Sequence, residues 1–482
     1  MIVGSANSQR MLLSVAVATA ASVGFAFLAY VAARYAGMLG IVALAGVAVV
    51  ALISALHPFV PFTVYFGLLF FADTRLPGLP MSLNQIIGPL FLLSATAYWA
   101  RGQMMRLQSK VLPWLLLMSA YFLINAVTGE SMENGLIQGR YVVIYCLYAV
   151  ALAAAMKSER AILAYAWIIT TLSFVAALAG IVEAIQKGTF FALAGKITDA
   201  VRVRGAASTA VVYGWNLLFA FPFAFFLFAE VRSRMWRGIA LLMACTILFV
   251  ALLSLSRTII ALVFIQTIVC ARLFRYPNRR RVLAVLGVLV IVAAALVMPV
   301  AIKRFVGVAD YRRDYSLMER RDNAIISREV FKAHPIFGVG LGSYSAVWRN
   351  YIPSDYRTFF AQYIEASRPR YTDQGYMQIL CEGGIVGFGL FAALIVVIFR
   401  QAFRIRRRAR ECDDSFAWNL AALVIAGLNH LLLSTLTDDT FLYVRVWLLY
   451  AVALLLDERL LWPRTDKEAV PGTTPPEPAG SS

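Results

Sequence analysis

Long apolar stretches dominate the chain, and short polar or basic segments separate them. A membrane-spanning helix needs about 20 predominantly apolar residues, with a range of about 17–25. The stretches predict about twelve to fourteen such helices, because the third is short and the first three are crowded. The expected spans are residues 11–33, 36–56, 58–72, 82–100, 111–127, 141–156, 161–183, 208–229, 238–254, 258–274, 282–301, 384–403, 416–436 and 441–456.

Composition agrees with this pattern. Of 482 residues, 61% are apolar and 15% are charged, whereas soluble domains have about 45–50% apolar and about 25% charged residues. We therefore expect an all-α polytopic integral membrane protein. The five cysteines have no metal-binding spacing, there are only three histidines, and no nucleotide-binding motif is present. The sequence predicts neither a metal site nor a cofactor.

The net charge of +18 bears first on membrane orientation. Cytoplasmic loops of membrane proteins carry an excess of Lys and Arg. If the N-terminus is cytoplasmic and the spans alternate, the short inside loops hold, with Arg10, twenty of the 44 basic residues. These loops are 101–110, 157–160, 230–237, 272–281 and 400–415. Much of the positive charge is thus explained by topology, without nucleic acid as a partner.

Two outside segments break the pattern of short loops. Segment 184–207 has four basic residues, and segment 302–383 has twelve basic and nine acidic residues. Long outside segments are not governed by the positive-inside rule, so they are either solvated loops or a basic surface for an anionic substrate. The expected organisation is N-terminal spans in 1–301, a large partly helical loop in 302–383, C-terminal spans in 384–456, and a disordered cytoplasmic tail in 457–482.

The large loop contains two patterned stretches. Arg320-Arg321-Asp322-Asn323 opens a helical stretch that ends near Ala333, before HPIFGVGLG at 334–342, where Pro and alternating Gly predict tight turns. The second stretch, YTDQGYMQILCEGGIVG at 371–387, predicts a helix from Gly375 into the next span. Asp373 would lie at the N-cap of that helix or just before it.

Together with the span that follows, these motifs resemble the O-antigen ligase and polymerase family. Ser254-Leu255-Ser256-Arg257-Thr258 and Arg202-Val203-Arg204-Gly205 resemble upstream elements of that family. The resemblance covers residues 200–450 and implies a GT-C-like fold in the bacterial inner membrane. It also implies action on undecaprenyl-pyrophosphate-linked glycans at the periplasmic face.

The resemblance assigns roles to individual positions. Arg257 and Arg321 match arginines that contact the donor pyrophosphate, and Asp373 occupies the position of the catalytic His of ligases. An Asp there is closer to the polymerase and exopolysaccharide branches, and a carboxylate can accept the proton of a sugar hydroxyl. Further candidates for substrate binding are Arg202, Arg204, Arg328, Asp438 and Asp439.

Each candidate also has a purely structural alternative. Arg257 could cap an outer turn or pair with an acidic residue, and Arg321 could lie on a solvated helix face. Asp373 could be a helix N-cap. Asp438 and Asp439 could form a salt bridge with Arg445 rather than hold an acceptor sugar.

The sequence thus predicts a metal-independent, periplasm-facing glycosyltransferase of O-antigen or exopolysaccharide synthesis, with both termini in the cytoplasm. A polymerase is favoured over a ligase that transfers glycan to lipid A-core, and a flippase for lipid-linked sugars is the alternative from another class. Expected partners are the undecaprenyl-pyrophosphate-linked oligosaccharide, an acceptor glycan or lipid, the bilayer and a chain-length regulator.

Overall fold

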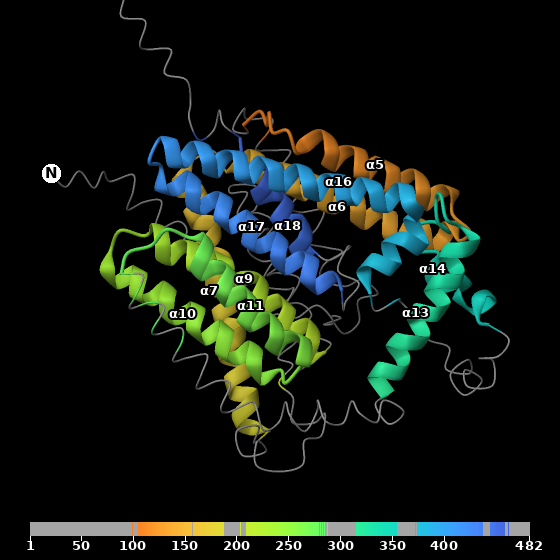
Figure 1. The fold of residues 1–482 in the computed structure, drawn as a ribbon, viewed down its shortest axis with the longest axis horizontal. Helices are drawn as coiled ribbons and strands as arrows, with labels where there is room; N and C mark the ends of the chain where they lie inside the picture. Colours follow the sequence, from red (N-terminus) through yellow and green to blue (C-terminus); the bar gives the residue numbers. More distant parts are fainter. Residues whose placement is uncertain are drawn as a thin grey trace, which may run out of the picture.

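In a computed structural model, the described part of the chain is helical and contains no strand (Figure 1). The structure describes residues 105–156, 158–187, 209–278, 315–353, 374–436 and 444–457, with a few isolated residues between them. The expected spans at 11–33, 36–56 and 58–72, and almost all of 82–100 and 282–301, lie outside the described residues. The helices are α5 (Leu112–Thr128), α6 (Met132–Ala155), α7 (Glu159–Gln186), α9 (Ala210–Glu230), α10 (Arg234–Leu253), α11 (Arg257–Leu273), α13 (Tyr315–Ala333), α14 (Tyr344–Val347), the 3₁₀ helix η3 (Trp348–Tyr351), α16 (Gly375–Glu411), α17 (Ser415–Thr435) and α18 (Val444–Leu454).

Six of these helices are long and apolar enough to cross a membrane: α6, α7, α9, α10, α16 and α17. Two shorter apolar helices, α5 and α18, and helix α11 also belong to the bundle. The fold class expected from the sequence, an all-α polytopic membrane protein, is confirmed. Helix α6 begins at Met132, earlier than the expected start at 141, because Glu133 and Arg140 lie on exposed positions and do not interrupt it.

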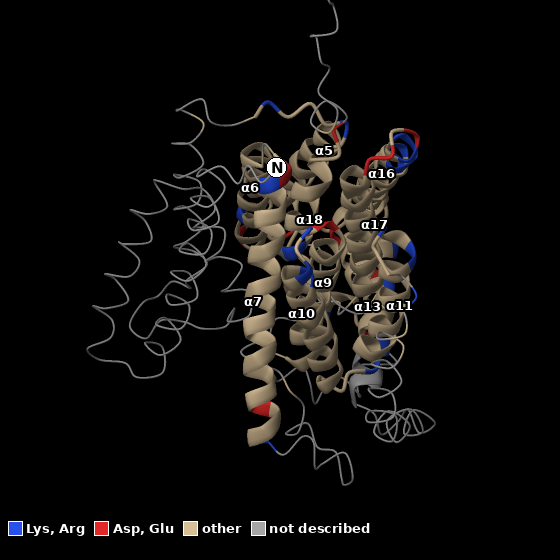
Figure 2. Ribbon diagram, turned by 90° about the vertical axis from the view of Figure 1, so that its left-hand side faces the viewer, with Lys and Arg blue, Asp and Glu red and all other residues tan. Residues whose placement is uncertain are grey.

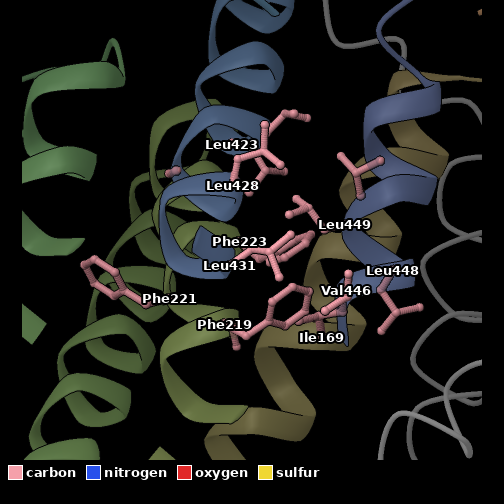
Figure 3. Packing of buried hydrophobic residues seen from close by; sticks show 14 of the residues in the cluster. Ile169, Phe219, Phe221, Phe223, Leu423, Leu428, Leu431, Val446, Leu448 and Leu449 are labelled. Atoms are coloured by element: carbon pink, nitrogen blue, oxygen red, sulfur yellow. The ribbon is translucent and has the colours of Figure 1, made fainter. Parts of the chain in front are cut away.

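Helix α9 lies at the centre of the bundle. Its hydroxyl N-cap, Thr209, accepts a hydrogen bond from the amide of Val212 at 3.1 Å, which satisfies one of the free donors of the first turn. Apolar side chains surround the helix on all sides, as expected of a helix without a solvent face. In Figure 3, Phe219 and Phe223 of α9 lie against Leu431 of α17 and Leu449 of α18.

The basic connecting segments meet at one end of the bundle. The indole of Trp418 donates to the carbonyl of Leu273 at 2.9 Å, and the guanidinium groups of Arg275 and Arg406 each lie 4.1 Å from its ring centroid. The backbone amide of Met105 donates to the carbonyl of Ala154, near the C-terminal end of α6, at 2.9 Å. Figure 2 shows Lys and Arg gathered where α16 ends. Segments far apart in the sequence thus share one basic end, as alternating spans require.

At the other end, the described part of the large loop is a small folded unit. Helix α13 confirms the helix expected from Arg320 to Ala333 and begins slightly earlier, at Tyr315. A separate apolar cluster joins Ile326 and Val330 of α13 to Val339, Trp348 and Cys381. The loop therefore has its own small core beside the membrane bundle.

Helix α16 contains the expected helix from Gly375 and the span that follows it. Gly384 interrupts the helical geometry with φ +63° and ψ −166°, a conformation that glycine adopts most readily. The kink divides a short segment that belongs to the loop from the long segment that forms the span.

Candidate functional site

The glycines of HPIFGVGLG allow the backbone to make close contacts. Gly338, Gly340 and Gly342 have φ values of +73°, +102° and +78°, in a region that L side chains rarely adopt. A Cβ on Gly340 would clash with the Cα of Gly129. The alternating glycines therefore allow both the tight turn and its close contact with the end of α5.

One buried amide of α5 holds this turn. The side chain of Asn125 donates to the carbonyl of Phe337 and accepts from the amide of Leu341, both at 2.8 Å. Nearby, the amide of Glu130 donates to the carbonyl of Val339 at 2.8 Å. The patterned loop is thus docked on the α5–α6 connection, which the sequence did not predict.

A buried carboxylate holds the other side of the turn. Glu382 is only 3% exposed. It accepts hydrogen bonds from the backbone of Gly342 and Tyr344 and from the side chain of Gln378. Sequence reasoning quoted Glu382 within its motif but gave it no role. The available signal was an acidic residue between an apolar run and two glycines, with Gln one helical turn earlier.

Replacing this carboxylate should loosen the loop. In Glu382→Ala, two backbone N–H groups lose their buried acceptor, which costs about 1–3 kcal/mol for each unsatisfied group. We expect a lower melting temperature of the detergent-solubilised protein, measured by differential scanning fluorimetry. Glu329→Ala is the matched control, because Glu329 forms only a partly exposed ion pair with Lys332, worth less than about 1 kcal/mol. Equal melting temperatures of the two variants would contradict a docking role for Glu382.

His334 has a structural position at the end of α13. Its Nε2 lies 2.9 Å from Oε1 of Glu130 and 2.7 Å from the hydroxyl of Tyr351. Partial burial, and then the negative charge of Glu130, raise the pKa of Tyr351. These contacts join the α5–α6 connection to η3 and give His334 a structural role.

Arg257 is the first residue of α11 and follows a buried turn. Ser254 and Ser256 are buried, and Leu255 has φ +52°, which makes the sharp reversal between α10 and α11. The side chain of Gln266, further along α11, donates to Ala426 of α17 at 2.9 Å. Arg257 therefore lies at the end of the bundle opposite the basic connecting segments, level with the end of α17.

The start of α16 reaches the same end. The hydroxyl of Tyr376 donates to the carbonyl of Leu432, near the end of α17, at 2.8 Å. Gln374 is the N-cap residue of α16. Asp373 itself lies outside the described residues, and its catalytic role stays a prediction.

Helix α13 carries the other candidate arginines. Arg321 and Arg328 are exposed and lie seven residues apart, on one face of the helix, whereas Asp322 and Ile326 are buried on the other. The thiol of Cys381 donates to the carbonyl of Ser327 at 3.1 Å and ties α13 to the first turns of α16. Arg202, Arg204, Asp438 and Asp439 lie outside the described residues.

A buried arginine was not among the sequence-based site residues. Arg445 of α18 is 3% exposed, and its Nη1 lies 2.8 Å from Oδ1 of Asn216 on α9. The salt bridge considered between Arg445 and Asp438 or Asp439 is not tested, because those residues are not described. Within the described residues, no three His, Cys, Asp or Glu side chains could hold a metal together, and the metal-free mechanism stays a prediction.

The helical bundle, its basic end and the folded loop at the opposite end define a polytopic membrane protein with a candidate site built from helix ends and a loop. Residues 242–392 match the model of the family described as O-antigen ligase. The match includes Arg257, Arg321 and both loop motifs and confirms the family resemblance there, whereas Arg202-Val203-Arg204-Gly205 lies outside the matched residues. No curated protein matches the chain.

Proposed function

We propose that the protein is a periplasm-facing glycosyltransferase that moves a glycan from undecaprenyl pyrophosphate to an acceptor in O-antigen or exopolysaccharide synthesis. The observation that carries the proposal is the position of Arg257. It begins α11 at the end of the bundle where the start of α16 meets the end of α17, within the segment that matches the O-antigen ligase family. An ionisable residue within an otherwise apolar segment marks a functional site by default.

The chemistry follows from the groups expected at this end. An acceptor hydroxyl attacks the anomeric carbon and gives its proton to Asp373. The bond between the anomeric carbon and the phosphate oxygen breaks, and its electron pair leaves with the lipid diphosphate. Arg257 and Arg321 stabilise that charge, because guanidinium groups stay protonated and bind phosphate oxygens in pairs. The remaining arginines, Arg202, Arg204 and Arg328, would hold the donor, and Asp438 and Asp439 would hold the acceptor.

A polymerase is our preferred form of this activity. The pair Asp373-Gln374 stands where ligases carry His and Asn, and this difference supports the polymerase. The family description, O-antigen ligase, is the observation that favours the second candidate, transfer of the finished glycan to lipid A-core.

The orientation is part of the proposal. The basic segments at one end of the bundle support a cytoplasmic location for that end and for both termini, in the bacterial inner membrane. Residues 1–301 and 384–456 would then form the membrane part. Residues 302–383 would form the periplasmic loop, and residues 457–482 a cytoplasmic tail.

The activity can be tested with purified protein and a synthetic lipid-pyrophosphate oligosaccharide. We expect release of lipid pyrophosphate together with a longer glycan, resolved by mass spectrometry. A flippase would move the donor across the membrane of a proteoliposome and leave it chemically intact, which would contradict the proposal.

Deletion of the gene separates polymerase from ligase. Loss of a polymerase leaves a single repeat unit on lipid A-core. Loss of a ligase leaves polymer on the undecaprenyl carrier. The two outcomes are distinguished by electrophoresis of lipopolysaccharide and by analysis of the lipid-linked pool.

A further inference from the structure

Two large apolar side chains are exposed at the tip of the glycine turn. Ile336 and Phe337 are 56% and 61% exposed, although the turn belongs to the large loop and not to a span. Apolar residues scattered singly over a surface are ordinary, whereas contiguous exposed apolar patches mark contacts with a partner or a membrane. The surroundings of these two side chains indicate what covers them.

The backbone of the turn finds its hydrogen-bond partners within the protein. The three carbonyls of residues 335–337 all accept from helices α5 and α16. The first two accept from the amides of Ile385 and Val386, at 2.9 and 3.2 Å, and the third accepts from the side chain of Asn125 at 2.8 Å. A turn in water can leave its carbonyls to the solvent, whereas non-helical backbone at membrane depth needs partners in the protein. The turn meets this requirement.

The turn packs directly on the backbone of α16 at its kink. A Cβ on Gly384 would clash with the backbone of Ile336, and a Cβ on Gly338 would clash with the backbone of Glu382. With the hydrogen bonds to Ile385 and the residue after it, these contacts fix the turn at the level of the first residues of the span.

The length of the span places that level within the bilayer. Between the kink and the exposed Arg400, the apolar stretch 385–399 has 15 residues. A helix of that length rises about 22 Å, whereas the hydrocarbon core is about 30 Å thick. With Arg400 at one boundary of the hydrocarbon, the other boundary lies beyond Ile385 and beyond the turn packed beside it.

The turn also continues the lipid-facing surface of the neighbouring helices. Ile385, Val396 and Phe403 of α16 are exposed, and their spacing of eleven and seven residues places them on one face. On α5, which packs beside α16 (Figure 1), Leu117 and Ile124 are exposed and lie seven residues apart. Exposed apolar faces of helices that cross a bilayer contact its acyl chains. The turn is held at the loop end of these two faces.

We propose that Ile336 and Phe337 are inserted among the acyl chains of the leaflet on the loop side of the membrane. This anchor goes beyond the proposed glycan transfer and is independent of it. It holds the folded unit of α13 and η3 against the membrane surface, because moving the loop away would expose both side chains to water.

Spin labels on single introduced cysteines test what surrounds the turn. The background chain carries Cys245→Ala and Cys412→Ser, because the other three cysteines are buried. The full chain is placed in liposomes of phosphatidylethanolamine and phosphatidylglycerol. Power-saturation electron paramagnetic resonance then compares collisions of the label with O₂, which concentrates in hydrocarbon, and with a water-soluble nickel chelate. At both Phe337→Cys and Ile336→Cys, we expect collisions with O₂ to exceed those with the chelate.

Two reference positions define the lipid and water limits. Val396→Cys lies on the exposed face of the α16 span, and Lys332→Cys lies on α13, where the side chain is 53% exposed. A label at Phe337→Cys should match the O₂-to-nickel ratio of Val396→Cys. A ratio equal to that of Lys332→Cys would overturn the anchor. Few collisions with either reagent would also overturn it, because a second copy or another segment of this chain would then cover the turn. Ile336→Cys decides the outcome alone if Phe337→Cys does not reach the membrane.

Discussion

Arg257→Ala is expected to abolish glycan transfer while the protein reaches its normal level in the membrane. Removing one preorganised donor to a developing negative charge costs about 10²–10³-fold in rate. Arg257 is the first residue of α11, so its backbone amide makes no hydrogen bond within the helix. The helix should therefore tolerate Ala at this position. Arg257→Lys should retain partial activity, because Lys keeps the charge but loses paired binding of phosphate oxygens. The measurement is the rate of lipid pyrophosphate release by purified variants.

A matched control for this variant is present in the same helix. Arg272 lies in the last turn of α11, at the basic end of the bundle, and Arg272→Ala should release lipid pyrophosphate at the wild-type rate. Wild-type turnover by Arg257→Ala, at normal protein levels, would place the diphosphate elsewhere.

Asp373→Asn is the second substitution with a large expected effect. Removing a general base lowers the rate by about 10²–10⁴-fold, and the amide has nearly the same shape as the carboxylate. Asn can also accept hydrogen bonds from free amides at the start of a helix, so this substitution separates a catalytic from a capping role of Asp373. We expect loss of glycan transfer with an unchanged melting temperature and unchanged binding of the lipid-linked donor.

A helix-capping role for Asp373 predicts the opposite pattern. Asp373→Asn would then keep its activity, and Asp373→Ala would lower both activity and melting temperature. Asp373→Glu retains the carboxylate on a longer side chain and should keep a small fraction of the rate only if the residue is a base.

The membrane helices could be predicted from the sequence because the bilayer imposes one strong rule. Every backbone polar group in hydrocarbon must be satisfied within a helix, so apolar length alone indicated α5 to α7, α9 to α11 and α16 to α18. Helix α13 could also be predicted, since Pro335 and the glycines after it end the helical stretch. The loop motifs were read correctly as a tight turn followed by a helix that enters a span.

The partners of isolated polar residues could not be predicted. Asn125 and Asn216 each stand alone in an apolar run, and nothing local shows that one binds the glycine turn and the other binds Arg445. These contacts join positions more than 200 residues apart. Glu382 was overlooked for the same reason, because its acceptor role depends on backbone groups of a separate segment.

The two hydrogen bonds of Asn125 to the glycine turn also limit how the chain can be divided into independent segments. The family match begins at residue 242, yet the turn within it is held by a side chain of α5, far upstream. The matched segment is therefore not an autonomous module. A chimera that exchanges this loop with that of a relative must carry the corresponding part of α5 with it, so the two stretches are expected to be inherited as one unit.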